Sequence, residues 1–123
     1  MKKILVICLI LSTSNMLFAS QSAEELANQK CGSCHLMGAI TKEKLKNMKA
    51  PPYWAIAKKA NLRYEKNEDR IKYLIDYALN PDEDKMLFPK ETKEKFGVMP
   101  SQKDKVTEDE IKLISEYILK EKS

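Results

Sequence analysis

The pentapeptide Cys31-Gly32-Ser33-Cys34-His35 decides the fold that we expect for this chain of 123 residues. Its C-x-x-C-H pattern is the signature of covalent attachment of a c-type haem. Two cysteines three positions apart on a helical turn can reach both vinyl groups of one porphyrin and form thioethers. The next residue then directs its imidazole at the iron. Because His35 is the only histidine in the sequence, no other imidazole competes for this role.

Two other uses of a C-x-x-C pair have to be weighed against haem. In an exported protein the two thiols can form a disulfide, or they can contribute to a zinc site. The adjacent histidine, the helical setting and the lack of further ligands in the sequence favour one covalently bound haem c, attached through Cys31 and Cys34. The third cysteine, Cys8, lies in the apolar segment near the N-terminus.

The first residues have the layout of a secretory signal. Two lysines precede the apolar run Ile4–Leu11, and small residues close the segment. We expect residues 1–19 to be a signal peptide cleaved after Ala19, with Ser20 as the second choice, and residues 20–123 to be the mature domain. The alternative is an uncleaved anchor, but the apolar run is far shorter than the roughly 20 residues of a spanning helix. The sequence therefore predicts a periplasmic protein without a permanent membrane span.

Signal removal changes the size and the charge of the chain. Cutting 19 residues from 123 leaves 104, which fits one small domain that benefits from a covalent cofactor in its core. The net charge falls from +4 to +2 because Lys2 and Lys3 leave with the signal. Two haem propionates would bring the protein near neutrality. This balance gives no indication of a nucleic-acid partner.

The mature chain shows helical periodicity and no convincing alternation of the kind that strands show, so we predict an all-α fold. Capping boxes at Ser22/Glu25 and Thr107/Glu110 mark the start of the first and last helices. Between them lie a loop with one helical turn and three further helices. The expected segments are Ala23 into the haem motif, the turn Thr41 to Lys46, Tyr53 to Leu62, a helix capped by Asn67 and ended by Asn80-Pro81, Lys90 to Phe96 with Gly97 at its end, and the final helix with Ile111, Ile114 and Ile118 as its buried stripe.

A second ligand for the iron is expected from a methionine. Met99 stands before Pro100, which restricts it to an extended conformation and holds its thioether away from the loop. Met37 is too close to His35 to reach the opposite face of the iron. Met48 lies in a loop and stays an alternative, whereas Met86 is expected to pack beside its apolar neighbours.

These features together make the chain similar to class I c-type cytochromes, the small exported bacterial monohaem cytochromes c. The resemblance covers most of the mature sequence and implies the cytochrome c fold, with about four to five helices wrapped around one covalently bound haem. It also implies contact between the first and last helices, where Ala23, Ala27 and Tyr117 occupy the matching positions. The sequence departs from the family at Leu36, where glycine is common.

The resemblance also suggests the surroundings of the haem. In similar proteins a proline carbonyl accepts a hydrogen bond from the haem histidine, and Pro51 or Pro52 is the candidate here. The alternative is that these prolines only start a helix. Tyr53 and Trp54 are expected to bind a haem propionate or to pack against the ring.

The ligand set His35 and Met99 predicts single-electron transfer rather than catalysis, because both axial positions of the iron are filled. We expect a periplasmic electron carrier. The alternatives are a haem subunit of a periplasmic oxidoreductase complex, for example one oxidising sulfur compounds, and a ligand-binding sensor or peroxidase. Acidic redox partners are expected to dock on lysines around the haem edge. These are Lys42, Lys44, Lys46, Lys49, Lys90, Lys93, Lys95, Lys103 and Lys105.

Overall fold

The computed structural model describes residues 21–120, and in this part the chain is all-helical, as predicted. The predicted signal peptide, residues 1–19, lies outside the described residues. The elements are α1 (Ala23–Cys31), α2 (Lys42–Asn47), α3 (Tyr53–Arg63), α4 (Asn67–Leu79), the short 3-10 helix η1 (Glu83–Lys85), α5 (Lys90–Phe96) and α6 (Glu108–Lys120). None of the helices between residues 21 and 120 is both long and apolar enough to cross a membrane.

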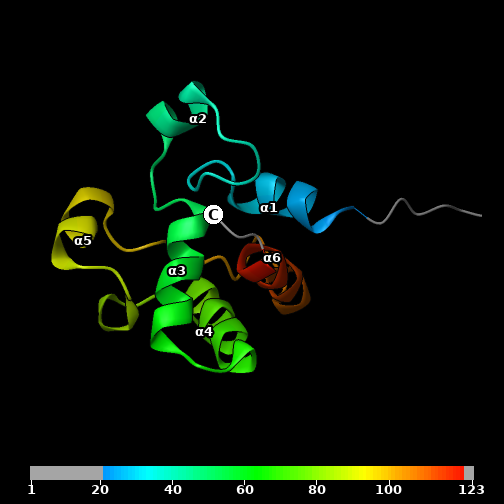
Figure 1. Cartoon of the computed structure of the whole chain (residues 1–123), viewed down its shortest axis with the longest axis vertical. Helices are drawn as coiled ribbons and strands as arrows, with labels where there is room; N and C mark the ends of the chain where they lie inside the picture. The colour runs from blue at the N-terminus through cyan, green and yellow to red at the C-terminus, as the bar shows by residue number, and fades with distance from the viewer. Residues whose placement is uncertain (1–20, 121–123) are drawn as a thin grey trace, which may run out of the picture.

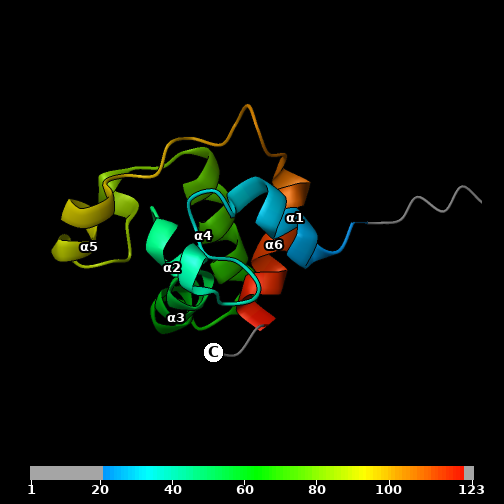
Figure 2. The same cartoon turned by 90° about the horizontal axis from the view of Figure 1, so that it is seen from above.

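The C-terminal helix α6 is the centre of the packing. It contacts α1, α3 and α4, and α3 also contacts α4 (Figure 1). The view from above shows α1 lying along α6 (Figure 2). This arrangement buries one apolar cluster shared by α1, α3, α6 and the loop after α1. Its members are Leu26, Ala27, Met37, Ala57, Ile114 and Ile118.

The contact between the first and last helices is confirmed. Ala27 is fully buried in the apolar cluster, and Tyr117 packs against the same cluster from α6. At the edge of this contact the Lys30 ammonium lies 3.8 Å from a Glu110 carboxylate oxygen and 3.2 Å from the Lys105 carbonyl oxygen. An alanine at the contact keeps the two backbones close, so the end of α1 is held in a defined place.

Both predicted helix starts are confirmed by hydrogen bonds. The Ser22 hydroxyl accepts from the Glu25 N–H at 3.1 Å. The Thr107 hydroxyl accepts from the Glu110 N–H at 3.1 Å, and the Glu110 carboxylate accepts from the Thr107 N–H at 3.0 Å. This reciprocal pair, together with the buried stripe of Ile111, Ile114 and Ile118, is the capping box and apolar face expected of α6.

One local prediction is wrong. Asn67 is the first residue of α4 rather than its cap, and Lys66 takes the cap position without a side-chain hydrogen bond. The turn before α4 is held instead by the Arg70 guanidinium, which donates to the Tyr64 and Glu65 carbonyls at 2.8 and 2.9 Å. The predicted helical turn near Thr41 to Lys46 is confirmed as the short helix α2, whose start is capped by the Thr41 hydroxyl, which accepts from the Lys44 N–H at 3.1 Å.

The segment with η1 and α5 lies to one side of the other helices (Figures 1 and 2). Neither element has a buried residue. Gly97 ends α5 with φ +73°, a conformation that glycine adopts easily, and its N–H donates to the Lys93 carbonyl at 2.8 Å. The chain then runs through Met99 to α6.

We predict that Thr107→Ala lowers the free energy of unfolding by about 1 kcal/mol, because the first turn of α6 loses the hydroxyl that accepts its N–H. Urea denaturation of the mature protein, followed by circular dichroism, measures the change. Lys112→Ala on the exposed face of α6 is the control and should change the stability far less. Equal stabilities of the two variants would contradict the role of the cap.

Candidate functional site

The Cys31–His35 turn begins where α1 ends. Cys31 is the last residue of α1, and its carbonyl accepts from the Cys34 N–H at 3.3 Å and from the His35 N–H at 2.9 Å. The two cysteines are free thiols and both are half-buried. Burial raises the pKa of the Cys31 thiol to about 11, and the neighbouring Cys34 adds to this effect. One tight turn therefore carries both sulfurs and the imidazole.

The orientation of His35 is set by the main chain of the loop that follows it. Its Nδ1 lies 2.6 Å from the Pro51 carbonyl oxygen, and a carbonyl can only accept, so Nδ1 carries the proton. The lone pair then belongs to Nε2, on the other side of the ring. Burial lowers the pKa of the imidazole, while the bond to Pro51 opposes this shift. A neutral imidazole held through Nδ1 is the form in which a histidine binds a metal.

The sequence left Pro51 and Pro52 open as the hydrogen-bond partner of His35, and in the structure the Pro51 carbonyl is the acceptor. Pro52 is the residue at the start of α3, where the absence of an N–H is tolerated. The loop between His35 and Pro51 is closed by two more main-chain bonds. The Tyr53 N–H donates to the Leu36 carbonyl at 3.1 Å, and the Lys49 N–H donates to the Cys34 carbonyl at 2.9 Å. The C-x-x-C-H motif is thus connected to the start of α3.

Tyr53 and Trp54 are the first two residues of α3 and are both half-buried. Their rings meet edge to face with centroids 5.3 Å apart, and the Tyr53 ring lies 6.1 Å from that of Tyr117 on α6. Tyr53 also packs against the apolar cluster. Packing is therefore a role that the structure supports for Tyr53. A contact of either residue with a haem propionate stays a prediction.

The four candidate methionines occupy different environments. Met37 is 2% exposed and belongs to the apolar cluster. Met99 is half-buried in the segment between α5 and α6. Met48 lines a cavity of about 470 Å³ together with Cys34 and His35, so it stays the alternative ligand. Met86 is half-buried directly after η1.

The structure brings Cys31, Cys34, His35 and Pro51 together, whereas Met99 is positioned separately by α4. Burial raises the pKa of the Tyr77 hydroxyl, and the nearby main chain of Met99 opposes this shift. Tyr73, one turn earlier, stacks on Tyr77 with ring centroids 5.8 Å apart. Neither tyrosine was predicted from the sequence to have a role. Their spacing of four residues, which places both on one face of a helix, was the available indication.

Comparison of the chain with protein-family models, with curated proteins and with solved structures finds no significant match. The site is therefore interpreted from its own residues. Among residues 21–120, no three side chains of histidine, cysteine, aspartate or glutamate gather in a way that could hold a metal ion.

Lys44, one of the lysines expected to attract acidic partners, is bound within its own loop. Its ammonium donates to the Met37 carbonyl and to the Ala39 carbonyl, both at 3.1 Å. The side chain therefore stabilises the loop that follows the haem motif. Lys42 and Lys46, by contrast, are exposed.

We predict that Lys44→Met speeds amide hydrogen exchange in residues 37–44 by about fivefold, because two carbonyls lose a charged donor. Exchange measured by mass spectrometry on the purified protein tests this. Lys42→Met, which removes an exposed lysine from the same helix, is the control. Identical exchange in the two variants would show that Lys44 does not stabilise the loop.

Proposed function

We propose that the chain is an exported class I c-type cytochrome that transfers single electrons between redox proteins. Cys31 and Cys34 would hold one haem covalently, and His35 would be its proximal ligand. The observation that carries this proposal is the 2.6 Å contact of His35 Nδ1 with the Pro51 carbonyl, directly beside two half-buried free thiols. It leaves Nε2 as the ligand atom.

The donor set fits a haem c. Two thiols and one neutral imidazole come from a single turn, and a thioether is available on another segment. The cofactor, when bound, supplies one-electron chemistry, and histidine–methionine ligation favours its ferrous form and raises its reduction potential. The all-helical arrangement and the contact of α1 with α6 are compatible with the cytochrome c fold that we propose.

The residues of the chain would hold the haem and orient its ligands, and they would not react themselves. Pro51 orients His35, and the packing of Ala27 against α6 places the turn that carries the cysteines. Because His35 and Met99 would fill both axial positions, electron transfer is favoured over catalysis.

The partners that we propose are redox proteins with acidic docking surfaces in the periplasm. Lys42, Lys46 and Lys49 are exposed on the loop after the haem motif, whereas Lys44 is bound to carbonyls of that loop. Exposed lysines of this kind raise association rates, and salt weakens the effect. Stable co-purification with an oxidoreductase would instead identify the protein as a haem subunit of that complex.

The mass of natively exported protein tests the proposal directly. We expect the mass of residues 20–123 plus one covalent haem. The Cys31→Ser/Cys34→Ser variant should lack this increment, and Ser33→Ala, within the same motif, is the control that should retain it. Exported protein without any covalent increment contradicts the proposed function.

We predict that Met99→Ala leaves the haem attached and lowers the reduction potential by on the order of 0.1 V, since axial ligands control potentials over a range of about 0.8 V. A spectroscopic redox titration measures the shift, and the absorption band of ferric iron bound to a methionine sulfur should disappear. Met48→Ala is the matched control. If Met48→Ala removes the band and Met99→Ala does not, Met48 is the distal ligand.

A further inference from the structure

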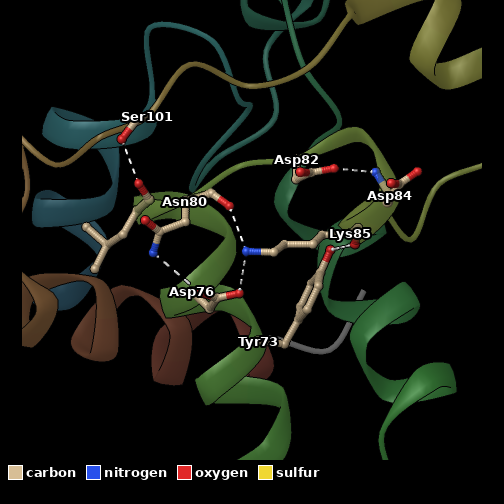
Figure 3. A network of polar contacts seen from close by, with 8 residues as sticks. Tyr73, Asp76, Asn80, Asp82, Asp84, Lys85 and Ser101 are labelled. Carbon is tan, nitrogen blue, oxygen red and sulfur yellow. Dashed lines mark hydrogen bonds and ion pairs between the residues drawn. The ribbon is translucent and has the colours of Figure 1, made fainter.

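The C-terminal end of α4 carries a set of polar contacts that the proposed function does not use (Figure 3). The last carbonyls of a helix have no partner within the helix. At the end of α4, the carbonyls of three successive residues accept hydrogen bonds from donors at the two ends of the segment that follows the helix. Those of Ala78 and Leu79 accept from the Gln102 N–H at 2.9 Å and the Ser101 hydroxyl at 2.6 Å. That of Asn80 accepts from the Lys85 ammonium at 3.0 Å.

Lys85 is held by α4 at more than one point. Its ammonium lies 3.0 Å from a carboxylate oxygen of Asp76, and its carbonyl accepts from the Tyr73 hydroxyl at 2.8 Å. Figure 3 shows Asp76, Asn80 and Tyr73 grouped around Lys85, with Ser101 on the other side of the helix end. The hydrogen bond with Lys85 lowers the pKa of Asp76.

Between these two points runs the segment of residues 86–100, which we term the Met99 arm. It contains α5, which has no buried residue and lies apart from the other helices in both views (Figures 1 and 2). No residue of α5 belongs to the apolar cluster that α1, α3 and α6 share. The polar contacts that we find to fix the arm lie at its two ends, where Lys85 and Ser101 bind α4.

We propose that Lys85 and Ser101 are positioning residues that anchor the Met99 arm to the C-terminal end of α4 and thereby hold Met99 in place as an iron ligand. This inference rests on the proposed function. Neither residue touches the haem motif in the contacts described above, so each acts through the arm. With both anchors removed, the arm opens more often and Met99 leaves the iron more readily.

The test uses the purified haem protein with Lys85→Met, Ser101→Ala and both changes together. Lys90→Met is the control, because it removes a lysine on the arm whose ion pair with Glu94, at 3.6 Å, is strongly exposed. Hydrogen exchange across residues 86–100 measures opening of the arm. The rate at which imidazole binds ferric haem measures loss of the methionine ligand.

The double variant should raise both rates by about tenfold over Lys90→Met, as expected when the Lys85–Asp76 ion pair and the Ser101–Leu79 hydrogen bond are both lost. Each single variant should give a smaller rise. Lys85→Arg and Ser101→Thr should restore the slow rates, because they keep the donors. If a variant instead lost structure throughout the protein, hydrogen exchange would also become faster in α1 and α6.

If hydrogen exchange in the arm is unchanged in the double variant, the inference is wrong. This holds even if the covalent haem is found and Met99→Ala lowers the reduction potential as predicted. Faster exchange with unchanged imidazole binding would overturn the link between the anchors and Met99. A missing haem mass in the unaltered protein is a different result, which contradicts the proposed function. The exchange of the arm would then still decide whether Lys85 and Ser101 hold it.

Discussion

The packing of α1 against α6 is the constraint on which the rest of the structure depends. Ala27 is fully buried in the shared apolar cluster, four residues before the first cysteine of the motif. Because a helix is stiff over one turn, burial of Ala27 also places Cys31 and the turn that begins there. The Lys30–Glu110 pair adds a polar contact at the same helix end. The motif is thus attached to the core rather than to a free loop.

From this turn a second connection runs to α3. The His35–Pro51 hydrogen bond, with the Leu36–Tyr53 main-chain bond beside it, closes the loop that contains α2. The same contact orients the imidazole and sets where α3 starts. The orientation of His35 and the position of α3 are therefore linked, and a shift of α3 would change the direction of Nε2. The Met99 arm is attached in a different way, because polar contacts with α4 hold its ends and no residue of α5 is buried.

The accuracy of sequence reasoning followed the range of the interactions involved. The caps at Ser22 and Thr107 and the isoleucine stripe of α6 were predicted correctly, because each depends on residues within one or two turns. Asn67 was assigned wrongly, because α4 already begins at Asn67 and Lys66 stands at the cap position without a side-chain hydrogen bond. Lys44 was assigned to the docking surface, although two carbonyls of its own loop bind it.

The sequence by itself determined the chemistry that this protein can perform: two thiols and one imidazole in a single pentapeptide, an all-helical chain, and a methionine before a proline. These are properties of residue type and short spacing. Only the tertiary structure decided which proline carbonyl orients His35, that Met37 is buried in the core, and that α4 anchors both ends of the Met99 arm. His35 and Pro51 are 16 residues apart and Leu79 and Ser101 are 22 apart, and only the folded backbone brings each pair within hydrogen-bonding distance.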